Sequence, residues 1–114
     1  MTLRLVQMAL VAIIFALAVS ERSKAAVPRH APPHKAQWLC IHRYEGSWRD
    51  PNAPYWGGLQ MDWSFMSTYG RELLRRKGTA DRWTPHEQMW VAERAWRSRG
   101  FWPWPTTARY CGLL

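Results

Sequence analysis

The hydrophobic positions of this chain form one long unbroken run near the N-terminus and shorter periodic segments elsewhere. Residues 5–19 are almost wholly apolar and follow a short start that contains Arg4. A bilayer-crossing helix needs about 20 such residues, so this run is too short, and small residues suited to a peptidase follow it. The pattern predicts a signal peptide over residues 1–25, cleaved after Ser20 or Ala25. An uncleaved membrane anchor is the alternative.

Helical spacing returns over residues 37–44, where apolar or aromatic side chains recur every third position. This segment predicts a short amphipathic helix that ends at Gly46, with Glu45 at its C-terminal end. Residues 50–54 contain two prolines and are typical of a turn. Residues 55–61, centred on two adjacent glycines, predict extended or looped backbone with at most a tiny strand pair.

A second helix is predicted over residues 62–69, because either Asp62 or Ser64 can cap its first turn. Residues 71–77 are expected to add a further turn or two before Gly78. The boundary between these two segments is not fixed by the pattern.

The clearest helix is predicted over residues 85–99. Thr84 and Glu87 have the spacing of a capping box, Pro85 occupies the first helical position, and Gly100 ends the helix. The proline-rich segment that follows, residues 101–105, cannot be helical and is expected to fold back over the core.

The length that remains after the signal peptide allows one compact core and no second domain. Residues 26–35 contain three prolines among basic residues and show no apolar periodicity, so they predict a flexible tether. The folded domain is expected over residues 36–114. Cys40 and Cys111 lie at its two ends and, in an exported protein, are expected to form one disulfide that stabilises the domain by roughly 4 kcal/mol. Two free buried thiols are the alternative.

Charge and tryptophan content narrow the set of partners. The chain has 16 Lys and Arg against 8 Asp and Glu, a surplus that attracts polyanions. Except at residues 75–77 the basic residues are dispersed, so nucleic acid is not expected, whereas anionic wall polymers or a membrane surface are. Nine tryptophans cannot all be buried in so small a domain, and exposed aromatic faces suit sugar rings. A cationic membrane-active protein is a further hypothesis, based on composition alone.

Glu45 is the candidate for chemistry. Its neighbours Tyr44 and Trp48 are aromatic, and it stands at a helix C-terminus, so both surroundings disfavour the charged form and predict a raised pKa. A carboxyl group that keeps its proton near neutral pH can donate it to a glycosidic oxygen. A surface residue at a helix end is the alternative interpretation. The histidines and cysteines show no metal-site spacing, so no metal or cofactor is expected.

Four motifs occur in a familiar order: Glu-Gly-Ser-Trp at residues 45–48, Tyr-Trp-Gly-Gly-Leu-Gln-Met at residues 55–61, Gln-x-x-x-Ala within residues 87–94, and Trp104-Pro105 followed by Cys111. Together they resemble the transglycosylase-like domain of actinobacterial resuscitation-promoting factors, which is itself similar to the core of lysozymes. The resemblance covers about residues 36–112. It implies a mainly α, lysozyme-like α+β domain in which a loop or tiny β-hairpin lines a cleft.

The resemblance implies an exported cell-wall enzyme that cleaves the bond between N-acetylmuramic acid and N-acetylglucosamine in peptidoglycan. Glu45 matches the catalytic acid, and Gln60 matches a cleft residue that hydrogen-bonds the glycan. Tyr55 or Trp56 is expected to line the groove, and Gly58 to let backbone approach the sugars. Peptidoglycan strands are then the expected partner of a monomeric protein.

The reaction type depends on a second carboxylate. A hydrolase needs one at a defined separation, whereas a lytic transglycosylase can use one acid and the substrate's own groups. Asp62 is the nearest candidate partner and Asp50 the second, although Asp62 serves equally well as a helix cap. We expect single-acid chemistry.

The chain also departs from the family pattern. Cys40 lies five residues before Glu45 instead of directly before it, the spacing from Glu45 to Trp48 is shorter, and Phe65-Met66 replaces a Thr-Trp pair. These departures favour the alternative function, a peptidoglycan-binding module with little or no turnover.

Overall fold

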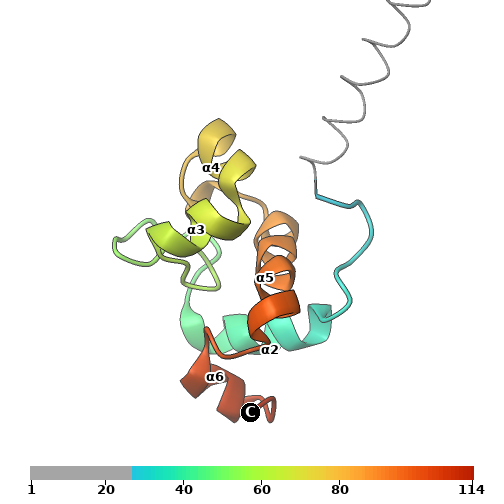
Figure 1. Cartoon of the computed structure of the whole chain (residues 1–114). Helices are drawn as coiled ribbons and strands as arrows, with labels where there is room; N and C mark the ends of the chain where they lie inside the picture. Colours follow the sequence, from blue (N-terminus) through green and yellow to red (C-terminus); the bar gives the residue numbers. More distant parts are fainter. Residues whose placement is uncertain (1–26) are drawn as a thin grey trace, which may run out of the picture.

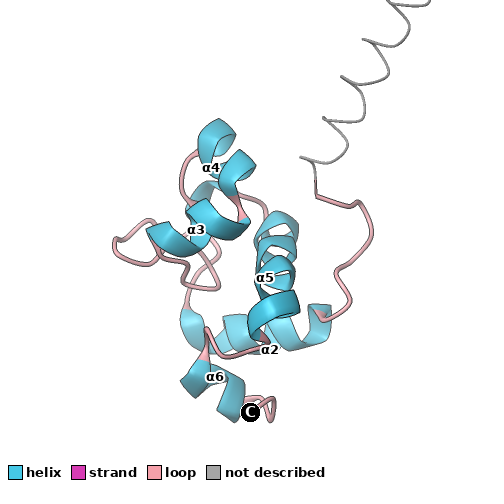
Figure 2. Ribbon diagram, in the orientation of Figure 1, coloured by secondary structure: helices cyan, strands magenta, loops and turns pink. Residues whose placement is uncertain are grey.

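The computed structural model describes residues 27–114, so the predicted signal peptide lies outside the described residues. The described part is mainly helical, as predicted (Figures 1 and 2). Its elements are α2 (Lys35–Glu45), α3 (Trp63–Tyr69), α4 (Arg71–Lys77), the 3-10 helix η1 (Ala80–Arg82), α5 (Pro85–Arg99) and α6 (Pro105–Tyr110). Within residues 27–114, the extended backbone forms a single antiparallel bridge, between Trp56 and Met61. No helix of this part of the chain is long and apolar enough to cross a membrane.

Helix α5 is the central element, since it packs against both α2 and α3 (Figure 1). Its start is the predicted capping box: the Thr84 hydroxyl accepts from the Glu87 backbone N–H, and the Glu87 carboxylate accepts from the Thr84 N–H. Gly100, at φ 57°, ends the helix. Residues 88–93 are all buried, so α5 is covered around most of its circumference. The buried hydrophobic core around it includes Trp38, Ile41, Leu59, Met66, Leu73, Trp83, Met89, Val91 and Trp104.

The fully buried side-chain amide of Gln88 attaches the backbone of three non-helical segments, at Trp48, Gly58 and Trp83, to α5. Its Nε2 donates to the carbonyls of Trp48, at 2.9 Å, and Trp83, at 3.1 Å, and its Oε1 accepts from the Gly58 N–H at 2.9 Å. A Cβ at Gly57 would come within 2.5 Å of this Oε1, and Gly57 has a φ of 75°. Glycine is therefore required there because the loop backbone approaches Gln88 closely.

The segment 27–34 was predicted to be part of a flexible tether, and this prediction is wrong. The backbone N–H of His34 donates to the carboxylate of Glu93, and its Nδ1 lies 2.7 Å from the same carboxylate. The Trp90 indole N–H donates to the His30 carbonyl at 2.9 Å. Glu93 is buried, and a buried carboxylate requires partners, which this segment supplies. The folded part therefore begins before residue 36.

The predicted disulfide between Cys40 and Cys111 is confirmed, and it joins α2 to the end of α6. Helix α6 itself was not predicted. Pro105 interrupts the preceding segment, but it occupies the first turn of α6, where a missing N–H costs nothing. The disulfide and α6 together bring the C-terminal part of the chain to the end of α2, where Glu45 lies (Figure 1).

Replacing Gln88 with methionine tests the role of this amide. The change keeps the side chain's volume but leaves two carbonyls and one N–H without their partner, so we expect the free energy of unfolding to fall by about 3 kcal/mol or more. Urea unfolding of the oxidised chain measures the loss. Gln37→Met, on α2 and only partly buried, is the matched control and should lower stability by less than about 1 kcal/mol. Equal losses in the two variants would contradict this role.

Candidate functional site

Glu45 is the last residue of α2, and its carboxyl group is half-buried. Its Oε1 accepts a hydrogen bond from the Thr107 hydroxyl at 2.9 Å. Burial raises the pKa of Glu45 above its ordinary value, and the Thr107 hydrogen bond opposes part of that rise. The direction is the one the sequence predicted, but the residues that cause it differ. Tyr44 is largely exposed, and the side chain that contacts the Glu45 carboxyl is Thr107 of α6.

Glu45 stands in a groove with a volume of about 370 Å³. The groove also contains Tyr55 and Gln60, so three of the residues predicted for the site come together. The remaining wall is formed by the turn before α6 and its first residues: Pro103, Trp104, Pro105, Thr106 and Thr107. The Trp104-Pro105 motif of this wall was noted in the sequence, but its place beside Glu45 was not predicted, because α6 lies about 60 residues further along the chain.

The side chain of Gln60 is held in one orientation beside the groove. Its Nε2 donates to Asp50 Oδ2 at 2.8 Å and to the Gly57 carbonyl at 2.9 Å. Both amide protons are therefore used, and the atom left to bind a ligand is the acceptor Oε1. Gln60 also has a φ of 51°, a left-handed conformation that non-glycine residues seldom adopt. Such conformations cluster at functional sites, which strengthens the case for Gln60.

Trp56 and Gly58, also predicted for the site, do not line the groove. Trp56 is partly buried and packs against the core, with its backbone paired to Met61. Gly58 is buried, and a Cβ there would come within 2.4 Å of the Trp48 ring. The expectation that Gly58 lets backbone approach a sugar is therefore wrong: it makes room for Trp48.

The two candidate partner carboxylates have different surroundings. Asp62 caps α3 by accepting from the Phe65 N–H at 2.8 Å. Asp50 lies beside Gly46, the residue that follows Glu45, since a Cβ on Gly46 would be 3.6 Å from Asp50 Oδ2. Hydrogen bonds from the Asn52 backbone and then from the Gln60 amide lower the pKa of Asp50. Asp50 does not line the groove, however; among the groove residues, the one that it contacts is Gln60.

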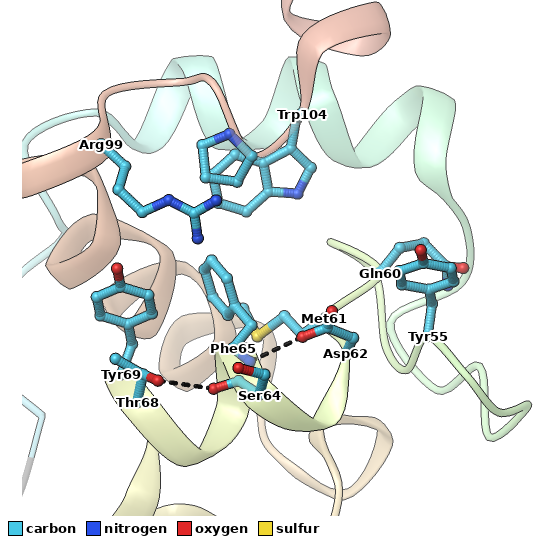
Figure 3. A pocket seen from close by; sticks show the side chains of 11 residues that line it. Tyr55, Gln60, Met61, Asp62, Ser64, Phe65, Thr68, Tyr69, Arg99 and Trp104 are labelled. Carbon is cyan, nitrogen blue, oxygen red and sulfur yellow. Dashed lines mark hydrogen bonds between the residues drawn. The ribbon is translucent and has the colours of Figure 1, made fainter.

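The groove continues into a second hollow of about 290 Å³, shown in Figure 3. The two share Tyr55, Gln60, Pro103 and Trp104. The second hollow extends along α3 to the end of α5, and its other lining residues are Met61, Asp62, Ser64, Phe65, Thr68, Tyr69 and Arg99. The Trp104 indole donates to the Leu59 carbonyl at 2.7 Å and so holds the two sides of the groove together. Asp62 lines this second hollow and at the same time caps α3.

The sequence matches no protein-family model, and no curated protein matches it. The resemblance to resuscitation-promoting factors therefore stays a prediction that rests on the motifs themselves. Within residues 27–114, no three His, Cys, Asp or Glu side chains gather as a metal site would require.

Thr107→Val tests whether the hydrogen bond from the Thr107 hydroxyl lowers the pKa of Glu45. Its hydrogen bond stabilises the carboxylate form, so removing it should raise the pKa of Glu45 further. Titration of the ¹³C-labelled Glu45 carboxyl by NMR measures the shift. Thr106→Val is the matched control, since Thr106 lines the same groove and makes no hydrogen bond to Glu45. An unchanged or lower pKa in Thr107→Val would refute the assignment.

Proposed function

We propose that this protein is an exported cell-wall enzyme that cleaves the glycosidic bond between N-acetylmuramic acid and N-acetylglucosamine in peptidoglycan. One observation carries the proposal: the Glu45 carboxyl has a pKa raised by burial, yet it stands in an open groove beside the oriented amide of Gln60. A proton donor with these properties suits general acid catalysis at a glycosidic oxygen. The helix-end acid facing a loop across a groove is the arrangement that a lysozyme-like fold would supply.

The other groups of the groove can hold the sugars. Gln60 Oε1 accepts a hydrogen bond from a sugar hydroxyl or an acetamido N–H, and Asp50 keeps that amide in place from behind. Tyr55 is half exposed at the groove, where its ring can stack on a sugar face. Specific binding of N-acetyl sugars follows from this pairing of one fixed acceptor and one exposed ring.

The proposed reaction needs one carboxyl group. Glu45 gives its proton to the glycosidic oxygen as the bond from that oxygen to the anomeric carbon of muramic acid breaks. The 6-hydroxyl of the same sugar then attacks the anomeric carbon and returns its proton to the Glu45 carboxylate. The product carries a 1,6-anhydro end, and the acid is restored without water. Asp50 lies behind Gln60 instead of in the groove, and Asp62, in the second hollow, is engaged as the cap of α3, which favours this route over hydrolysis.

Three features of the chain agree with the proposed location and partner. The Cys40–Cys111 disulfide is compatible with an oxidising, extracytoplasmic compartment. The net charge of +8 favours association with anionic wall polymers or with a membrane surface. Exposed tryptophans on the described surface, Trp63 and Trp102, add sites that suit glycan contact.

Glu45→Gln should lower the release of soluble products from peptidoglycan by about 100-fold or more, since an amide cannot donate the proton. Mass spectrometry of the soluble fraction measures this loss, and wild-type products are expected to carry 1,6-anhydro ends. Glu72→Gln, at a partly exposed acid of α4 that pairs with Arg76, is the matched control and should keep full activity. Full activity in Glu45→Gln would eliminate the proposed mechanism.

The fold of Glu45→Gln should be intact. A raised folded-state pKa means that the stability Glu45 contributes is present below pH 4.5, its ordinary pKa, and is lost as the pH rises through the folded-state value. Glutamine stays neutral and loses no stability over that pH range, so the variant should be at least as stable as wild type at neutral pH.

In the mass spectrometry experiment, products with reducing ends would instead identify a hydrolase. No products from either protein, with glycan binding retained, would identify a binding module.

A further inference from the structure

The groove has two chemically different ends. Glu45 and Thr107 lie at one end, and Tyr69 and Arg99 lie at the other, with Tyr55, Gln60 and Trp104 shared between them. A chain of sugars that places one bond beside Glu45 must therefore extend past Gln60 toward Arg99. The end at Tyr69 and Arg99 is therefore where the protein can bind a substituent on a neighbouring sugar.

Arg99 brings a positive charge to that end. It is the last residue of α5, and Figure 3 shows its guanidinium directed into the hollow, on the side of Trp104 and across from Phe65 and Tyr69. Among residues 27–114, no carboxylate lies within ion-pair distance of Arg99. The guanidinium is thus available to an incoming anion, which it can bind with two parallel hydrogen bonds.

Neighbouring groups keep this end positive and fixed in shape. Arg94 donates to the Tyr69 carbonyl at 3.1 Å and so ties the end of α3 to α5. Asp62 is the one acid lining this hollow, and its carboxylate caps α3, where the helix N-terminus balances its charge. In Figure 3, Asp62 stands next to Met61, and its carboxylate is directed toward the backbone N–H of Phe65 and not toward Arg99.

We propose that Arg99 is a specificity-determining residue that binds a carboxylate on the glycan, at the end of the groove remote from Glu45. This inference rests on the proposed function and names the feature by which the groove distinguishes its substrate. Muramic acid can supply the carboxylate from its own lactyl group, or from the peptide attached to that group. A plain N-acetylglucosamine chain carries neither, so it binds without this contact.

The test measures binding to the oxidised full chain carrying Glu45→Gln, which holds ligands without cleaving them. The probes are a neutral N-acetylglucosamine tetrasaccharide, a muramic-acid-containing tetrasaccharide with free lactyl groups, and the same tetrasaccharide bearing peptides. Calorimetry gives each Kd before and after adding Arg99→Gln. Adding Arg97→Gln instead is the matched control, because Arg97 is exposed on the same helix and does not line the groove.

Arg99→Gln should weaken binding of the carboxylate-bearing probes about fivefold and leave the neutral probe unchanged, whereas Arg97→Gln should leave all three unchanged. A loss confined to the free-lactyl probe identifies the lactyl carboxylate, and a loss with the peptide-bearing probe identifies the peptide. Equal losses for neutral and charged probes, no loss with any probe, or the same loss from Arg97→Gln would overturn the inference while the proposed function stands. No binding of any probe before Arg99 is changed would overturn both.

Discussion

The buried amide of Gln88 is the interaction on which the rest of the structure depends. Its three hydrogen bonds attach the carbonyls of Trp48 and Trp83 and the N–H of Gly58 to the central helix α5. A loop has no regular ladder of its own, so its backbone groups need partners wherever they are buried. Gln88 supplies those partners from a fixed helix, and the loop that carries Gln60 is thereby held against the core.

The groove is completed by two further constraints. The disulfide holds α6 at the end of α2, where the Thr107 hydroxyl reaches the Glu45 carboxyl. The Trp104 indole then joins the α6 side to the loop side by its bond to the Leu59 carbonyl. The acid, the amide and the wall thus come from three separate segments of the chain, which the disulfide and these two hydrogen bonds hold together. Such preorganisation is what a general acid needs in order to act without rearrangement.

Local signals in the sequence predicted helices α2, α3, α4 and α5 but not α6, whereas long-range contacts determine the site. The capping box at Thr84 acts within one helical turn, so the residues themselves reveal it, and the same local reasoning reduced the cap of α3 to Asp62 or Ser64, of which the structure has Asp62. The proline-rich composition of residues 27–34 predicted a flexible tether. The segment is instead held by the buried Glu93 carboxylate of α5, which is distant in the sequence. Gly58 shows the same limit, since its need for glycine comes from the Trp48 ring and not from a ligand.

Glu45 is proposed to be the group that protonates the glycosidic oxygen, and a crystal structure of Glu45→Gln with a muramic-acid-containing oligosaccharide tests this most directly. The sugars are expected to lie along the groove, with a glycosidic oxygen within hydrogen-bond distance of the residue 45 amide and Gln60 Oε1 bound to a sugar. Sugars bound on another face, or lying in the groove with every glycosidic oxygen out of reach of residue 45, would contradict it.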